Sequence, residues 1–129
     1  MSEENLEVVR KAYEAFGRGD LPTVFDLLDP EVAFYQTELL PWGGRREGHE
    51  GMRSFLEDLT SAIESQVEPE EFVEAGDRVV AVGRTRGQVR ATGEEFDVRA
   101  VHVWALRGGK VVRFEAYIDT PKMREALGL

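Results

Sequence analysis

The chain has 129 residues, a formal net charge of −9 and no cysteine. This length suits one domain with a buried core, and 42% hydrophobic with 32% charged residues is typical of a folded soluble protein. A negative balance repels phosphate backbones, and the lack of cysteine excludes disulfides, thiol nucleophiles and cysteine-ligated zinc. We therefore expect a cytoplasmic protein with no nucleic-acid partner, no membrane association and, given the acidic residues 1–11, no signal peptide.

Apolar residues recur every three or four positions in the first part of the chain, which predicts helices. The first apolar stripe, ending before Gly17 and Gly19, consists of Leu6, Val9, Tyr13 and Phe16. Asp20 is a candidate N-cap for a short second helix that ends at Asp29-Pro30. A third helix, with His49 near its start, is indicated by Met52, Phe55, Leu56, Leu59 and Ile63.

Strand patterns surround and follow that third helix. Residues 31–37 alternate and carry aromatic side chains, so they predict a strand, and the glycine-rich residues 39–51 predict a long loop. From Gln66 onward the period is two, which predicts strands at 67–75, 78–90, 94–107 and 110–119, before a short helix opened by Thr120-Pro121. Turns this short require antiparallel neighbours, so we predict an α+β fold with helices against one sheet face.

The turn at Gly108-Gly109 predicts which side chains share a face of this sheet. If these glycines form a two-residue hairpin loop, Arg107 pairs with Lys110, and directly opposed residues project to the same side. The resulting pairs are His102 with Glu115, Trp104 with Arg113, Ala100 with Tyr117 and Val98 with Asp119. The same rule at Thr92-Gly93 places four small residues of the neighbouring strand on that same face: Ala81, Gly83, Thr85 and Gly87.

This prediction gives the sheet two unlike faces. Titratable groups beside small residues are typical of a pocket lining. The opposite face would carry Val80, Val82, Val101, Val103, Val112, Phe114, Ala116 and Ile118. An alternative is that the valine face packs on the helices and that the polar face is solvated.

Three segments carry a resemblance to a known family. AYEAFGRGDLPTVFDLLDPEV, GGRREGHEGMRSFL and VWALRGGKVVRFEAYIDTPKMREALGL resemble SnoaL-like members of the NTF2-like and ketosteroid isomerase-like superfamily. Over nearly the whole chain, residues 1–129, the resemblance implies one domain in which a curved antiparallel sheet wraps the N-terminal helices into a cone with a pocket. It further implies a homodimer through the outer sheet face, here the predicted valine face, and no cofactor.

The same resemblance suggests catalytic positions. Polyketide cyclases of the SnoaL type use an acidic base, and Asp119 matches that position. Ketosteroid isomerases carry an oxyanion-hole tyrosine, a general-base aspartate and a protonated aspartic acid, where this chain has Ala12, Gln36 and, nearby, His102. Base and oxyanion hole both differ, so we do not expect steroid isomerisation by the known mechanism.

Each candidate residue has a functional and a structural interpretation. Asp119 is a candidate general base or a helix N-cap. His102, oriented by Glu115, is a candidate acid–base pair or a stabilising cross-strand pair. Tyr13 and Phe16 are assigned to the core, and no histidine spacing supports a metal site. Candidate ligand-binding residues are Tyr117, Gln36, Trp42, Tyr35 and Arg113, the last also a cation–π partner for Trp104.

Together these residues predict a protein that binds a small, largely apolar carbonyl compound. In an enzyme, Asp119 would remove a proton beside the carbonyl and His102 or Tyr117 would stabilise the enolate, as in an isomerase, cyclase or dehydratase. Two alternatives stay open. One is a non-catalytic ligand-binding or assembly module, and the other is an epoxide-hydrolase-like site built from Asp119, Glu115 and Arg113.

Overall fold

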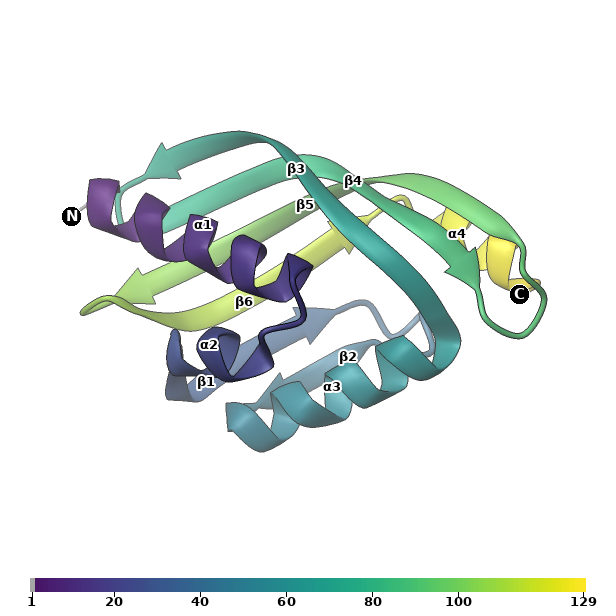
Figure 1. Ribbon diagram of the computed structural model, residues 1–129, viewed down its shortest axis with the longest axis horizontal. Coiled ribbons are helices and arrows are strands. Elements are labelled where there is room, and N and C mark those ends of the chain that lie inside the picture. The colour runs from purple at the N-terminus through teal and green to yellow at the C-terminus, as the bar shows by residue number, and fades with distance from the viewer. Residues whose placement is uncertain (1) are drawn as a thin grey trace.

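The computed structural model describes residues 2–129, which form four helices and one six-stranded sheet (Figure 1). The helices are α1 (Ser2–Gly17), α2 (Leu21–Asp26), α3 (Gly48–Ala62) and α4 (Thr120–Leu127). The strands are β1 (Leu28–Gln36), β2 (Gly44–Glu47), β3 (Ile63–Ala75), β4 (Arg78–Val89), β5 (Glu95–Arg107) and β6 (Lys110–Ile118). The predicted α+β class is confirmed.

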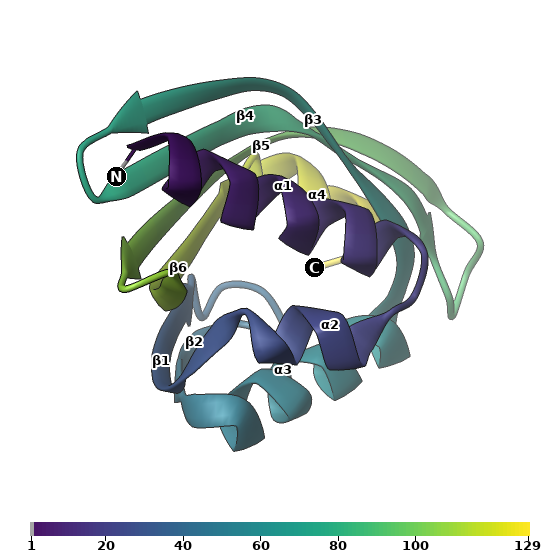
Figure 2. The same ribbon diagram turned by 60° about the vertical axis from the view of Figure 1, so that its left-hand side comes forward.

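The sheet has the strand order β2-β1-β6-β5-β4-β3. Strands β3 to β6 form the predicted antiparallel meander, and β1 joins its β6 edge in parallel. The sheet arches over α1, with α2 and α3 on the same concave side (Figure 2). The enclosed space between sheet and helices is the interior of the cone. Within residues 2–129, no helix is long and apolar enough to cross a membrane.

Side-chain caps explain where the short helices begin. The Asp20 carboxylate accepts a hydrogen bond from the backbone N–H of Thr23 at 3.2 Å, as predicted for the start of α2. Asp119 does the same for α4, accepting from the N–H of Lys122 at 3.3 Å. Gly128 then ends α4 in the left-handed conformation, with φ of 78°.

The predicted loop at residues 39–51 is partly wrong. It contains β2, which pairs with the end of β1, and the first turn of α3. Gly44 and Gly48 have φ of 108° and 71°, so these glycines supply sharp backbone turns at the two ends of β2. A four-residue strand between glycines has too little alternation to be recognised from sequence. Ile63, assigned to the third helix, likewise begins β3.

The predicted register of β5 and β6 is also wrong beyond the first pairs. Arg107 pairs with Lys110 as expected, and Leu106 pairs with Val111, but Ala105 pairs with Arg113. Val112 is therefore an extra residue in β6, a β-bulge, and every later pair is displaced by one position. A one-residue shift moves side chains to the other face of the strand.

The bulge decides which side chains of β6 enter the cone. His102 lies opposite Ala116, and Trp104 lies opposite Phe114, on the concave face. Arg113, Glu115 and Tyr117 consequently lie on the convex face. Ala81 and Thr85 of β4 are on the concave face as predicted, since Ala81 pairs directly with His102.

Candidate functional site

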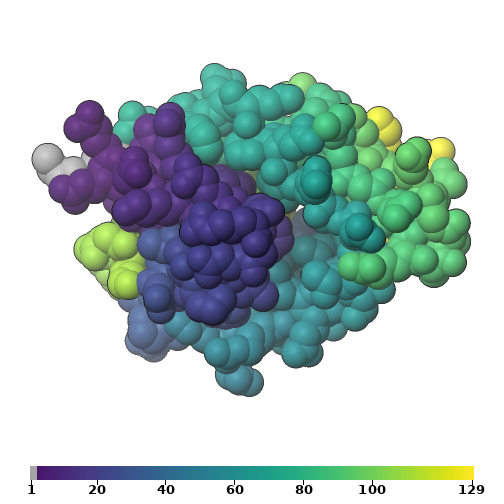
Figure 3. All heavy atoms as spheres, in the orientation of Figure 1, coloured from purple at the N-terminus to yellow at the C-terminus, as the bar shows by residue number. Residues whose placement is uncertain are grey.

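A cavity of about 120 Å³ lies between the concave face of the sheet, α1 and α3. In Figure 3 the surface is hollowed between the purple N-terminal helices and the teal segment that contains α3 and β3. The lining is predominantly apolar and aromatic, which suits a small uncharged ligand. Its members include Phe16, Phe34, Trp42, Phe55, Leu56, Leu59, Trp104, Phe114 and Ile118.

At one end of the cavity, three side chains form a hydrogen-bonded chain. The indole Nε1–H of Trp104 donates to the Tyr13 hydroxyl at 3.0 Å, and that hydroxyl lies 2.6 Å from Nδ1 of His102. The Tyr13 ring lies edge-on to Trp104, with ring centroids 5.3 Å apart. Helix α1 supplies the tyrosine, and β5 supplies the other two residues, two positions apart on one face.

The chain of donors fixes the tautomer of His102. An indole N–H can only donate, so the Tyr13 oxygen acts as its acceptor. A hydroxyl oxygen can accept twice, but the Tyr13 proton has no other acceptor among residues 2–129, so we assign its donation to Nδ1 of His102, which leaves the imidazole proton on Nε2. Nε2 has no hydrogen-bond partner among residues 2–129, although His102 is only 9% exposed and lines the cavity.

Burial keeps the two titratable groups of this hydrogen-bonded network, His102 and Tyr13, neutral. The pKa of His102 is lowered from 6.5 to about 4, because burial disfavours the charged imidazolium. The pKa of the Tyr13 phenol is raised above its ordinary value, mainly by burial, with the Trp104 hydrogen bond acting weakly in the other direction. At neutral pH the cavity therefore offers a neutral imidazole N–H donor.

A second polar group enters the cavity from β1. Gln36 is 4% exposed, and its Oε1 accepts a hydrogen bond from Nε1 of Trp42 at 3.1 Å. Because indole only donates, this contact assigns the oxygen and nitrogen of the Gln36 amide. The amide NH₂ has no acceptor among the described residues, and Gln36 lines the cavity.

The sheet register relates Gln36 to His102. Tyr35 of β1 pairs with Glu115 of β6, so the next residues, Gln36 and Ala116, lie side by side, and Ala116 pairs with His102. Gln36 and His102 are thus two strands apart on one face, at a Cα separation of about 10 Å. Ala116, which lies between them, also lines the cavity.

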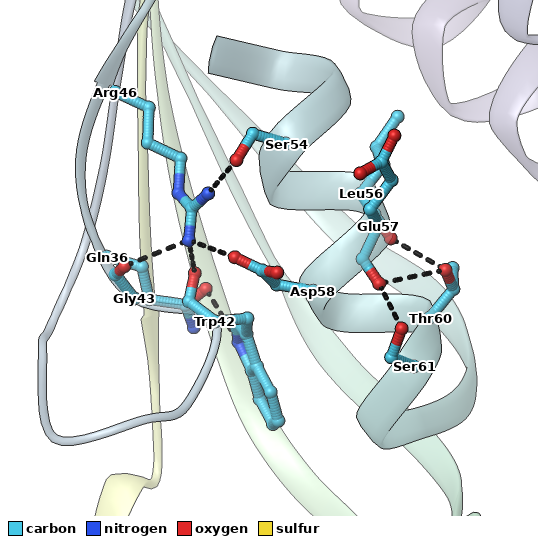
Figure 4. A network of polar contacts seen from close by, with 10 residues as sticks. All are labelled: Gln36, Trp42, Gly43, Arg46, Ser54, Leu56, Glu57, Asp58, Thr60 and Ser61. Carbon is cyan, nitrogen blue, oxygen red and sulfur yellow. Dashed lines mark hydrogen bonds and ion pairs between the residues drawn. The ribbon is translucent and has the colours of Figure 1, made fainter.

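Arg46 of β2 connects the loop that carries Trp42 to helix α3 (Figure 4). Its guanidinium donates to the backbone carbonyls of Trp42 and Gly43 at 3.1 and 3.2 Å, and to α3 through Ser54 at 2.8 Å and Asp58 at 2.9 Å. The remaining guanidinium nitrogen, Nε, is buried without a partner among the described residues. The loop carrying Trp42 is consequently fixed to α3, and Trp42 in turn orients Gln36.

The structure separates the residues that the sequence assigns to a site. His102, Gln36 and Trp42 line the cavity, but five others do not. Asp119 is exposed and caps α4, so its structural interpretation holds in this geometry. The remaining four lie on the convex face. The bulge places Glu115, Tyr117 and Arg113 there, and strand alternation in β1 places Tyr35 there.

These convex-face residues form their own cluster. The Glu115 carboxylate accepts hydrogen bonds from Arg113 and, at 2.7 Å, from the Tyr117 hydroxyl. The Arg113 contact, followed by the Tyr117 contact, holds the pKa of Glu115 below its usual value. Tyr117 and Tyr35 have ring centroids 6.3 Å apart. Glu115 therefore does not orient His102, and Arg113 does not stack on Trp104, because the sheet lies between them.

Sequence reasoning missed Tyr13 as a candidate site residue. Its place in the apolar stripe of α1 suggested the core, and its ring does pack there, but its hydroxyl contacts His102. The signal available was its position one residue from the oxyanion-hole tyrosine of ketosteroid isomerases. Within residues 2–129, no group of three histidine, cysteine, aspartate or glutamate side chains could hold a metal ion.

Comparisons with known proteins agree with this architecture. The SnoaL-like domain family matches residues 9–114. An NTF2-like protein from Burkholderia pseudomallei is 34% identical with a TM-score of 0.91, and one from Burkholderia xenovorans is 29% identical with a TM-score of 0.88; each alignment covers 98% of both chains. TerC, co-crystallised with polyporic acid, is 29% identical with a TM-score of 0.89, over 98% of this chain and 99% of TerC. No curated protein matches the sequence.

Proposed function

Because this chain belongs to the SnoaL-like domain family, with an NTF2-like fold, we propose that it binds a small, largely apolar carbonyl compound in the cone cavity. The observation that carries this proposal is the pairing of an apolar, aromatic lining with the neutral Trp104–Tyr13–His102 chain. Desolvating a carbonyl is costly unless a donor replaces water, and Nε2–H of His102 is such a donor.

The cavity volume sets the scale of the ligand. A dry apolar cavity of about 150 Å³ accommodates benzene. The cavity here is about 120 Å³ and opens to the surface, so the enclosed part suits a single ring. Polyporic acid, with which TerC was co-crystallised, is a second compound to test against this chain because of the similarity to TerC.

The geometry supports binding more directly than proton abstraction. No aspartate or glutamate of the described chain is among the residues that line the cavity, and Asp119 is occupied at the start of α4. The His102 tautomer inferred above presents a donor, which can stabilise negative charge on an oxygen but cannot accept a proton at Nε2. Ligand binding is thus the proposed function, and an isomerase or cyclase reaction is the alternative.

The convex face supports the further proposal of a homodimer. Half-buried valines of β4 and β5 lie there, with Val73 44% exposed and Tyr117 47% exposed at its borders. Contiguous apolar side chains on a sheet face are typical of an interface. The valines are Val80, Val82, Val101 and Val103.

The binding proposal is tested by titrating the protein with 2-cyclohexenone and following backbone amide NMR signals. We expect saturable shifts of residues around the cavity, and weaker binding by roughly tenfold in His102→Leu. The matched control is His49→Leu, since His49 is the only other histidine and does not line the cavity. Wild-type binding that survives His102→Leu unchanged would remove the imidazole from the site, and no binding of any cyclic ketone would overturn the function.

A further inference from the structure

Each of the two polar groups that face the cavity is oriented by a tryptophan. Trp104 donates to Tyr13 and Tyr13 donates to His102, so the donor left free in this network is Nε2–H of His102. Trp42 donates to Oε1 of Gln36, so the donor left free there is the amide NH₂. The chain has only these two tryptophans.

Both groups therefore present the same polarity. Gln36 and His102 are each more than nine-tenths buried, and neither terminal N–H group has a protein acceptor within residues 2–129. Neither N–H is sealed in the core, since Nε of Arg46 is the one polar side-chain atom of residues 2–129 that is both fully buried and unpaired, so water or a ligand oxygen can accept from each donor. A cavity with two such donors discriminates in favour of a ligand with two acceptors.

We propose that the site selects a small cyclic compound with two carbonyl oxygens on opposite sides of its ring, one bound by Gln36 and the other by His102. This rests on the proposed function and adds its selectivity. The register places the two residues about 10 Å apart at Cα, on one face, with Ala116 between them. A ring above Ala116 can direct one oxygen to each donor, and the aromatic lining contacts its faces.

The test compares 1,4-cyclohexanedione with cyclohexanone, which have nearly equal size and differ by one carbonyl. The indole N–H signals of Trp42 and Trp104 report the two donors separately. We expect the dione to bind roughly tenfold more tightly and to shift both indole signals. In Gln36→Met the preference falls to about twofold, the statistical advantage of two equivalent carbonyls, because one hydrogen bond is lost. Gln66→Met, at an exposed position outside the cavity, keeps the full preference.

The possible outcomes are distinguishable. Equal binding of the two ketones by the wild-type protein overturns the two-carbonyl proposal and leaves carbonyl binding intact. A preference for the dione that persists in Gln36→Met overturns the role of Gln36. Failure of both ketones to bind overturns the proposed function together with this inference. If Gln36→Met does not fold, the wild-type comparison and the two indole signals still decide the proposal.

Discussion

Ala116 lies directly opposite His102 in the β5–β6 ladder, and Phe114 of the same strand packs edge-on against the imidazole, with ring centroids 5.0 Å apart. On the other side of His102, its β4 partner is Ala81, which is as small as Ala116. Phe72 of β3 pairs in turn with Ala81, and Gln36 of β1 lies beside Ala116. In this row across the sheet, the imidazole is thus the one large side chain between Gln36 and Phe72. Its surroundings are apolar, and its charge state follows from them.

His102 should make the protein less stable in acid. Its folded pKa of about 4 lies below its ordinary value of 6.5, so between these pH values the unfolded state binds a proton that the native state does not. The free energy of unfolding is therefore unaffected by His102 above pH 6.5 and falls as the pH drops, by about 1.4 kcal/mol per pH unit. Urea unfolding measures this effect. Between pH 7 and pH 4.5, the free energy of unfolding should fall by about 2–3 kcal/mol more in wild type than in His102→Gln. Equal losses in both proteins would contradict a buried neutral imidazole.

Tyr13→Phe should disrupt the polar end of the cavity without removing its ring. The substitution leaves Nε1 of Trp104 and Nδ1 of His102 without their partner, at a cost of about 1–3 kcal/mol in the free energy of unfolding. The tautomer of His102 is then no longer fixed, which ¹⁵N NMR of the imidazole detects directly. Phe16→Leu is the packing control, because Phe16 lies about one helical turn after Tyr13 and also lines the cavity. A single Nε2–H tautomer in Tyr13→Phe would show that Tyr13 does not set it.

Arg46→Lys should loosen the loop that carries Trp42. Lysine cannot reproduce the fork that reaches two carbonyls, Ser54 and Asp58, so we expect a loss of about 1–3 kcal/mol and altered Trp42 fluorescence. Arg53→Lys is the control, because Arg53 forms only an exposed 3.4 Å ion pair with Glu50 and a contact on Phe25. Similar losses in the two variants would argue against a special role for Arg46.

Asp119 can be tested as a cap and as a base at once. Asp119→Ala should destabilise the protein by about 0.5–2 kcal/mol, whereas Asp119→Asn keeps the cap and should cost little. Both variants should bind cyclic ketones as wild type does. If Asp119→Asn instead abolished exchange of ketone α-protons catalysed by the wild-type protein, Asp119 would be the general base after all.

Val103→Lys should prevent dimerisation through the convex face. A charge placed among the half-buried valines opposes burial of that face against a second copy. Light scattering should give twice the chain mass for wild type and the single chain mass for Val103→Lys. The control is Leu39→Lys, which alters a 59% exposed residue in the loop between β1 and β2 and should also give twice the chain mass. A monomeric wild-type protein at micromolar concentration would exclude the dimer.

Much of this architecture could be predicted from sequence because it depends on local patterns. The caps at Asp20 and Asp119, the stripe of α1 and the period-two strands are each encoded within a few residues. The site was harder, since it depends on which face of β6 turns inward. Nothing in the run Lys110–Arg113 marks Val112 as a bulge, so the carboxylate and phenol that looked like neighbours of His102 were assigned to the wrong side.

The bulge at Val112 thereby makes the pairing of β6 a determinant of the cavity's chemistry. If Val112 instead paired with Ala105 and the bulge were absent, Arg113, Glu115 and Tyr117 would turn into the cone and Phe114, Ala116 and Ile118 toward water. An apolar chamber would acquire an anion and a cation, and the β6 part of the core would be lost. A substitution that draws Val112 into the ladder would therefore exchange the two faces of β6, whereas deletion of Val112 would keep Arg113 opposite Ala105 and leave both faces as they are.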